Sequence, residues 1–169
     1  MASKPQQTSE NLSAPSSNVS ALPARVQEMR EAILAAVQAR DIEALRPAIE
    51  RNETLPIFAR GPLRPRTFAQ AVDFLKSRSQ DKSGAETLRV LEAIFEQPYV
   101  KSTRGQSVTY VWPAFALIPK APATEEELAQ RWRCVLFSSL RGDGPLVVQR
   151  IGIGADGTWH YFWGGSESE

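Results

Sequence analysis

The C-terminal segment RIGIGADGTWHYFWGG, residues 150–165, places the strictest limits on the architecture of this chain. Its glycines follow the spacing G-x-G-x-x-G, which in dinucleotide-binding proteins leads directly into a helix and then a second parallel strand. Only TWHYFWGGSESE follows Gly157, and these residues are aromatic and β-prone, without helical amphipathicity. The segment therefore predicts paired strands and argues against a nucleotide site.

A β-hairpin accounts for the same residues. Asp156 and Gly157 are a preferred pair for the centre of a type I′ turn, in which both residues have positive φ, and strand-like runs flank them. A two-residue turn fixes the register of the two strands. The predicted pairs, from the turn outwards, are Ala155–Thr158, Gly154–Trp159, Ile153–His160, Gly152–Tyr161, Ile151–Phe162 and Arg150–Trp163.

This hairpin is expected to have two apolar faces, because side chains alternate along each strand. One face carries Val147, Ile151, Ile153, His160 and Phe162, and the other carries Trp159, Tyr161 and Trp163. Gly152 and Gly154 leave gaps in the second face, which the aromatic rings opposite them can cover. In this register Arg150 can also stack on Trp163.

Length and composition predict one domain. The 169 residues are 42% hydrophobic, which is enough for a core of ordinary size. The formal net charge is only +1, so no general attraction to nucleic acid or to an anionic membrane is expected. The longest apolar run, residues 111–119, contains two prolines and is too short to span a bilayer. The arginines of ARGPLRPR are more typical of a solvated loop than of a phosphate site.

The N-terminal residues have a different composition from the rest. Residues 1–22 are rich in Ser, Pro, Gln and Asn and have almost no large apolar side chains, so they predict a disordered leader without the apolar region of a signal peptide. Such a leader fits a cytosolic tail and the start of a mature exported protein equally well. A single α+β domain is expected over residues 23–165, followed by a flexible tail at 166–169.

Periodicity and capping signals place helices in the first part of the chain. A helix is expected to begin at Pro23, and Asp41 caps a short second helix that Pro47 should kink or split. Three capping boxes begin further helices, and these are Thr67 with Gln70, Ser83 with Glu86, and Thr124 with Glu127. In the last of these helices, the expected apolar stripe consists of Leu128, Trp132, Val135, Leu136 and Ser139.

Strands dominate the later part. Residues 107–112 alternate in polarity and predict a strand that Pro113 ends. Residues 133–140 fit either the end of a helix or a short strand, because periodicity does not separate the two. Since no alternating βαβ pattern and no repeat occur, the expected fold is α+β, with N-terminal helices packed on a small antiparallel sheet that ends in the C-terminal hairpin.

The sequence contains no catalytic constellation. His160 and Cys134 are the only residues of their types, so a Cys–His nucleophilic site would need this pair, with Asp143 or Asp156 orienting the imidazole. Both are more typical of core positions, although His160 remains a weak catalytic candidate. One histidine and one cysteine do not provide the common zinc ligand sets, and neither a metal nor a cofactor is expected.

Large aromatic residues are the better candidates for function. A two-layer domain normally buries only one face of its sheet. Either helices cover both faces, or one aromatic face contacts a ligand, a glycan or another chain. The candidate binding residues are Tyr110, Trp112, Arg150, Trp159, Tyr161 and Trp163.

Three segments, ARDIEALRPAIERNE, TYVWPAFA and RIGIGADGTWHYFWGG, occur in this order over most of residues 24–165. Together they resemble an uncharacterised proteobacterial family of exported proteins with a YVWP-like motif and a terminal GI-x-x-DGTW segment followed by Phe. The matching positions are 110–113 and 152–162. The resemblance implies a periplasmic or cell-envelope location and supplies no activity. The ARDIEAL stretch is also similar to the entry of pocket domains of the nuclear-transport-factor-2 kind.

We therefore expect a non-enzymatic binding or interaction module of the cell envelope, which contacts a protein or glycan partner through its aromatic hairpin face. One alternative is a small-molecule enzyme with a pocket of the nuclear-transport-factor-2 kind, in which His160 acts as acid or base. Another is a structural homodimer joined through the aromatic face. A cytoplasmic location is the alternative to the envelope.

Overall fold

The computed structural model describes residues 9–118, 120–137 and 147–164. The helices are α1 (Ala24–Ala39), α2 (Arg46–Glu50), α3 (Phe68–Ser77), α4 (Ala85–Phe95) and α5 (Glu125–Arg133). The strands are β1 (Glu10–Leu12), β2 (Val100–Arg104), β3 (Ser107–Trp112), β4 (Gln149–Gly154) and β5 (Trp159–Gly164). Short 3-10 turns are η1 (Val19–Ala21), η2 (Ile42–Leu45), η3 (Gly61–Leu63) and η4 (Ala114–Ala116).

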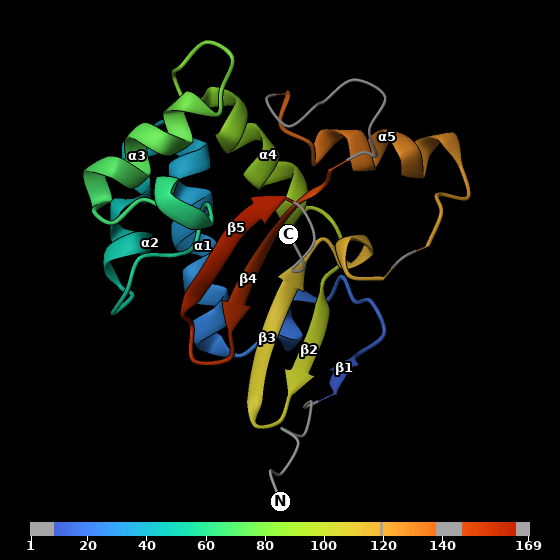
Figure 1. Ribbon diagram of the computed structural model, residues 1–169. Coiled ribbons are helices and arrows are strands. Elements are labelled where there is room, and N and C mark those ends of the chain that lie inside the picture. The colour runs from blue at the N-terminus through green and yellow to red at the C-terminus, as the bar shows by residue number, and fades with distance from the viewer. Residues whose placement is uncertain (1–8, 119, 138–146, 165–169) are drawn as a thin grey trace, which may run out of the picture.

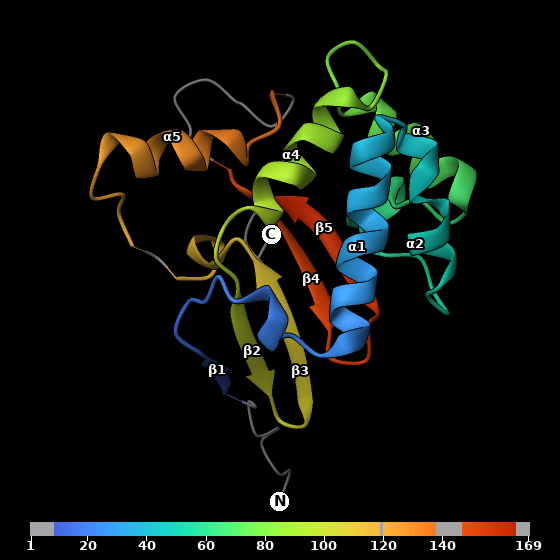
Figure 2. The ribbon, with the colours of Figure 1, turned by 180° about the vertical axis from the view of Figure 1, so that it is seen from behind.

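The strands form one antiparallel sheet in the order β1-β2-β3-β4-β5. Figures 1 and 2 show that α1 covers one face of this sheet, whereas α2 and α3 lie beyond its β5 edge and α5 lies beyond the strand ends near α4. Helices therefore precede most of the sheet, and the chain ends in a hairpin. The predicted α+β fold class is confirmed.

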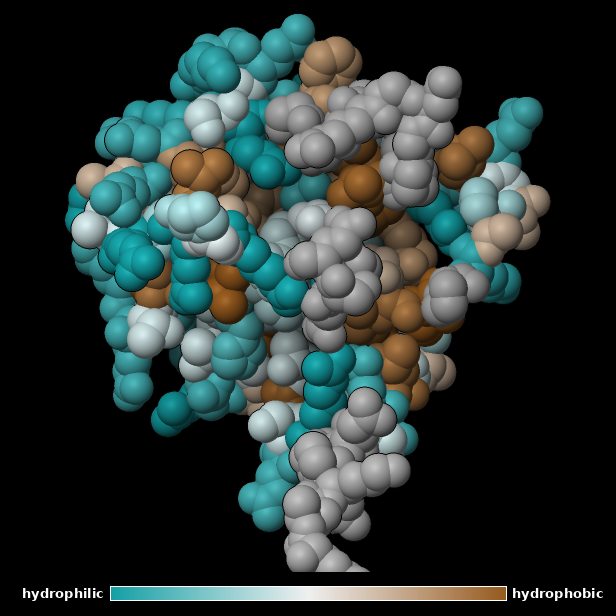
Figure 3. All heavy atoms as spheres, in the orientation of Figure 1, coloured by the Kyte–Doolittle hydropathy of each residue, from teal (hydrophilic) through white to brown (hydrophobic). Residues whose placement is uncertain are grey.

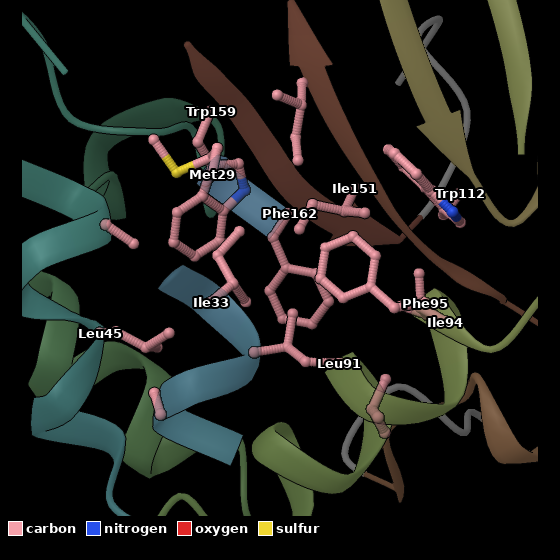
Figure 4. Close-up of a cluster of buried hydrophobic side chains, with 14 of the residues drawn as sticks. Met29, Ile33, Leu45, Leu91, Ile94, Phe95, Trp112, Ile151, Trp159 and Phe162 are labelled. Atoms are coloured by element: carbon pink, nitrogen blue, oxygen red, sulfur yellow. The ribbon is translucent and has the colours of Figure 1, made fainter. Parts of the chain in front are cut away.

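The main core lies between the sheet and the helices. Side chains from β3, β4 and β5 meet side chains from α1 and α4 (Figure 4). Its large members with little or no exposure include Ile33, Leu91, Ile94, Trp112, Ile151 and Trp159. None of the helices in the described ranges is long and apolar enough to cross a membrane.

The first two predicted helices are confirmed in detail. Pro23 precedes α1, and the predicted stripe positions Val26, Met29 and Ile33 are buried. Asp41 accepts a hydrogen bond from the N–H of Glu43 (2.9 Å), as an N-cap does. The expected interruption near Pro47 is visible as the change from η2 to α2.

Two of the three capping boxes begin helices as predicted. The Thr67 hydroxyl accepts from the N–H of Gln70 (3.2 Å), and the Thr124 hydroxyl accepts from the N–H of Glu127 (3.1 Å). The capping box predicted at Ser83 is wrong, because the N-cap of α4 is Gly84, which has φ 88°. A Cβ atom at Gly84 would lie 2.9 Å from Cβ of Ile42, so packing against η2 selects glycine there.

The predicted stripe on α5 is wrong. No residue of α5 is buried, and Leu128 and Trp132 are 41% and 50% exposed. The helix ends at Arg133, and residues 134–137 form no strand, while 138–140 lie outside the described residues. The amphipathic pattern predicted the helix correctly, but its apolar side chains are only about half covered by the described part of the chain.

The predicted disordered leader is wrong for residues 9–22. β1 pairs with β2, and the Ser16 N–H and carbonyl bond to the carbonyl and N–H of Tyr99. The Tyr99 hydroxyl donates to the carbonyl of Asn18 (2.8 Å), and Leu22 is buried. A polar segment can be held in this way by backbone hydrogen bonds, which composition does not reveal. Residues 1–8 and the predicted tail at 166–169 lie outside the described residues.

The turn between β4 and β5 differs from the predicted one. The N–H of Gly157 donates to the carbonyl of Gly154 (2.8 Å), and the N–H of Gly154 donates to the carbonyl of Thr158 (2.8 Å). Gly157 has φ 89°, but Asp156 does not have positive φ. The loop therefore has three residues and ends in a left-handed glycine, which is a common alternative to the two-residue type I′ turn.

The longer loop changes the pairing near the tip of the hairpin. Three predicted pairs are confirmed, namely Arg150–Trp163, Ile151–Phe162 and Gly152–Tyr161. Beyond an irregularity, Ile153 pairs with Trp159 and not with His160. Because a shift of one residue moves a side chain to the opposite face, Trp159 lies in the core and His160 is exposed. The predicted faces of Trp159 and His160 are therefore wrong.

The outer edge of β5 is covered at its centre by the loop after α2. The Ile57 N–H donates to the His160 carbonyl (2.9 Å), and the Ile57 carbonyl accepts from the Phe162 N–H (3.0 Å). The Asn52 amide bonds to both backbone groups of Trp159, each at 3.0 Å. These hydrogen bonds pair the backbone groups at the edge of β5 and hold the irregular segment around His160 in place.

Candidate functional site

Half of the six candidate binding residues lie in the core. Tyr110, Trp112 and Trp159 are 9%, 0% and 1% exposed. Trp112 packs edge-to-face on Phe95 (5.2 Å between ring centroids), and Trp159 packs in the same way on Phe58 (5.4 Å). These three aromatic residues stabilise the domain and have no surface to offer to a partner.

The other three candidates lie on the sheet face turned away from α1, which we call the outer face. It carries Ser102, Arg104, Val111, Arg150, Tyr161 and Trp163, and Figure 1 views the sheet from this side. A small apolar cluster of Val100, Val111 and Ala114 lies there, with Leu117, Ile118 and Tyr161 packed against it. In the same view, Figure 3 shows apolar side chains gathered between the sheet and α5.

Of the two glycines that aromatic rings of the outer face were predicted to cover, one is covered as predicted. A Cβ atom at Gly152 would lie 2.5 Å from Cζ of Tyr161, so this ring occupies the space that glycine leaves. At Gly154 the neighbouring ring belongs to His160, whose Nε2 would be 2.6 Å from such a Cβ. The Tyr161 ring stacks on the Trp163 ring, with 5.6 Å between centroids and 20° between planes.

Two arginines lie against this aromatic pair. The Arg60 guanidinium lies over the Trp163 ring at 4.1 Å, in the position that the sequence predicted for Arg150. Arg150 lies 5.8 Å from the centroid of the Tyr161 ring instead. The predicted stack of Arg150 on Trp163 is therefore wrong. A loop far away in the sequence provides the stacking cation, and this frees Arg150 for another contact.

Arg150 has an unusual environment for a charged side chain. It is 5% exposed, and its Nε and Nη2 atoms are buried without a hydrogen-bond partner among the described residues. Within the described ranges, the indole Nε1 of Trp163 is also buried without a partner. Burying two N–H groups without an acceptor costs about 1–3 kcal/mol for each group, since they lose their hydration and receive no hydrogen bond in exchange. This arrangement does not serve stability.

A carboxylate occupies the β1 end of the outer face. The Ser102 hydroxyl donates to Oε1 of Glu10 (2.6 Å), and Arg104 Nη2 donates to Oε2 (3.2 Å). The hydrogen bond from Ser102 lowers the pKa of Glu10, and the charges of Arg104 and Arg150 lower it further. A cavity of about 170 Å³ adjoins this contact and extends to Tyr161.

Sequence reasoning missed Glu10, Ser102 and Arg104. Glu10 fell within the segment expected to be disordered, and β2 reads VKSTR, which lacks an alternating apolar pattern. The available signal was the Arg104–Gly105–Gln106 stretch between two short β-prone runs, where Gly105 has φ 59°. That signal predicts a hairpin but not its contact with the N-terminal segment.

No Cys–His site forms. Cys134 is fully buried, its carbonyl accepts from the N–H of Gln149 at the start of β4, and His160 lies by Gly154 at the other end of that strand. The length of β4 separates them by about 16 Å. Asp156 bonds to the N–H of Thr158 (3.0 Å), the main cause that lowers its pKa. Asp143 lies outside the described residues, and within the described ranges no three potential ligands form a metal site.

Cys134 is expected to make the fold sensitive to alkaline pH. Burial raises the pKa of its thiol to about 12, so the thiol ionises in the unfolded chain before it ionises in the folded one. The stabilisation is complete below the ordinary thiol pKa and is lost as the pH rises towards 12. Between pH 8 and 10 the loss should be about 1–2 kcal/mol. Urea unfolding at both pH values measures it, and Cys134→Ala should show a smaller decrease; an equal decrease would contradict this origin.

No family model, curated protein or solved structure matches this chain. The resemblance to the exported family therefore stays a prediction.

Proposed function

We propose that this protein is a non-enzymatic binding module and that its outer face receives a carboxylate group of a protein partner. The observation that carries the proposal is the pair of buried donors on Arg150. Nε and Nη2 form one side of the guanidinium group, and the part of the chain that the structure describes offers neither of them an acceptor. Two parallel N–H groups in this geometry match the two oxygens of a carboxylate.

The surroundings of Arg150 support an anionic ligand. Arg60 and Arg104 add positive charge to this side of the sheet, and Glu10 is the acidic side chain already bonded there. The stacked rings of Tyr161 and Trp163 provide rigid contact area next to the cation. Aromatic and arginine side chains are the types that contribute most to binding energy at protein interfaces.

Catalysis receives less support from the same residues. His160 lies by Gly154, four residues further along β4 than Arg150, and Cys134 is a buried, neutral thiol. Neither side chain adjoins the unpaired donors of Arg150. A location in the cell envelope, which rests on the motif resemblance, is part of the same proposal.

A titration with glutarate, a small dicarboxylate, tests the proposal on the full chain. We expect the Nε–H resonance of Arg150 and the Nε1–H resonance of Trp163 to shift saturably in ¹⁵N-correlated spectra. Arg150→Met should weaken the binding roughly tenfold to a hundredfold, because a hydrogen bond to a charged group contributes about 1.5–3 kcal/mol. The same variant should raise the free energy of unfolding by about 1–3 kcal/mol, since two buried N–H groups without an acceptor are removed.

Arg64→Met is the matched control. It removes the same charge from an exposed position in the loop after η3, so it should leave both the binding and the stability close to those of the parent. Equal binding by the parent and Arg150→Met would contradict the proposal, as would an equal loss in Arg64→Met.

A further inference from the structure

The outer face already holds one carboxylate, and the way in which it is held identifies a class of partner. Glu10 belongs to β1, an extended segment at the edge of the sheet, and its carboxylate is bonded to Ser102 and Arg104. Ser102 is 6% exposed and its hydroxyl donates to this carboxylate, whereas the side chains of Glu10 and Arg104 are 31% and 48% exposed. The chain therefore displays an acidic strand bound to β2.

β1 is held by few contacts. It has only three residues, all of them exposed, and its pairs with β2 are Glu10–Arg104, Asn11–Thr103 and Leu12–Ser102. Leu12 is 39% exposed and therefore contributes little apolar burial. The firm anchors of the segment come later in the chain, at Asn18 and Leu22. Because β1 is anchored less firmly than the residues that follow it, β1 can detach while those residues stay in place.

The site beneath Glu10 has room for more than one side chain. The adjoining cavity of about 170 Å³ is lined by Thr109, Val111 and Tyr161 as well as by Ser102 and Arg104. Tyr161 in turn lies beside Arg150. A longer acidic segment on β2 would thus lie near Arg150, whose buried donors carry the proposed function.

We propose that an extended, acidic segment of a partner protein pairs with β2 in place of β1, and that β1 regulates the site by occupying it within the same chain. Addition of a strand to a sheet edge supplies affinity through backbone hydrogen bonds and specificity through alternate side chains. Here the selecting side chain is an acidic residue that bonds to Ser102 and Arg104. This inference rests on the proposed function, because it names the partner of the same outer face.

The chain's own sequence provides the probe. A fluorescein-labelled peptide SENLSAP, residues 9–15, is titrated with the full-length chain, and fluorescence anisotropy reports binding. Glu10→Gln weakens the hold of β1, so this variant should bind the peptide about tenfold more tightly than the parent does. A peptide with Gln in place of Glu should bind the variant about tenfold less tightly than the original peptide.

Glu43→Gln is the matched control, because Glu43 is an exposed glutamate with only a 4.0 Å contact to Lys76. The Glu43→Gln variant should bind the peptide as weakly as the parent does. Amide hydrogen exchange gives a second measurement: Glu10→Gln should speed exchange at Ser13 and Ser16, which donate to β2 and to Tyr99, and should leave Ile151 unchanged.

The outcomes separate this inference from the proposed function. If Glu10→Gln binds the peptide no better than Glu43→Gln while glutarate still shifts the Arg150 resonance, β1 does not regulate the site and only this inference fails. If the peptide binds as expected and glutarate causes no shift, the role of Arg150 fails instead. A doubled mass of Glu10→Gln in sedimentation would mean that β1 is exchanged with a second copy, which would overturn the assignment to an external partner.

Discussion

Trp159→Ala is expected to lower the free energy of unfolding by about 3–5 kcal/mol. The side chain is 1% exposed, packs edge-to-face on Phe58 and donates from Nε1 to the carbonyl of Tyr161 (3.1 Å). Removing it would leave a large cavity where the hairpin meets the helical layer. Urea denaturation of the parent and the variant measures the difference.

Tyr161→Ala is the comparison within the same strand. Tyr161 lies on the outer face, where it covers Gly152 and stacks on Trp163, and it is only partly buried. We expect a loss of roughly 1–2 kcal/mol, because much less of its surface is removed from water on folding. A larger loss for Tyr161→Ala than for Trp159→Ala would mean that the irregular pairing near the tip is wrong.

Gly157→Val is expected to cost about 2–5 kcal/mol, because it combines two unfavourable effects. A β-branched residue is strained at φ 89°. In addition, a Cβ atom at this position would lie 2.9 Å from the backbone oxygen of Arg25, which cannot move without displacing the first turn of α1. The melting temperature should fall by roughly 2–4 °C for each kcal/mol in a chain of this length.

Gly61→Val separates the two effects. Gly61 also has positive φ, 76°, but nothing lies within 4 Å of a Cβ built on it. This variant should therefore show only the cost of backbone strain, about 1–3 kcal/mol. If Gly157→Val melted at the temperature of the parent, the three-residue loop would have to be rejected.

The hairpin shows what sequence patterns can and cannot predict. Alternation and the Asp156–Gly157 pair predicted both strands and three of the cross-strand pairs correctly. They did not predict the loop length, since a two-residue and a three-residue turn can both place glycine at the left-handed position. A difference of one residue in the loop length places Trp159 and His160 on the sheet faces opposite to those predicted. An error of one residue in the turn therefore changes which side chains are assigned to the candidate site.

The part of the outer face formed by β1 and β2 could not be predicted, for a different reason. Glu10 and Ser102 are separated by 92 positions in the sequence, and neither β1 nor β2 has an apolar pattern that would predict a strand. Their pairing depends on backbone hydrogen bonds, which carry almost no compositional signal. Arg150 was identified as a candidate from its place in the register, but the register does not indicate that Arg60 stacks on Trp163 or that two donors of Arg150 lack an acceptor among the described residues.

The cover that Ile57 and Asn52 provide along β5 also limits how the molecule can assemble. Open-ended growth by strand addition requires each copy to offer two free sheet edges, one for the preceding molecule and one for the next. In the described sheet the β5 edge is closed at its centre, so association by strand addition is directed to the β1 side alone. A strand added at the β1 side leaves the covered β5 edge at the other end of the sheet, so edge-to-edge stacking of sheets is not continued through β5.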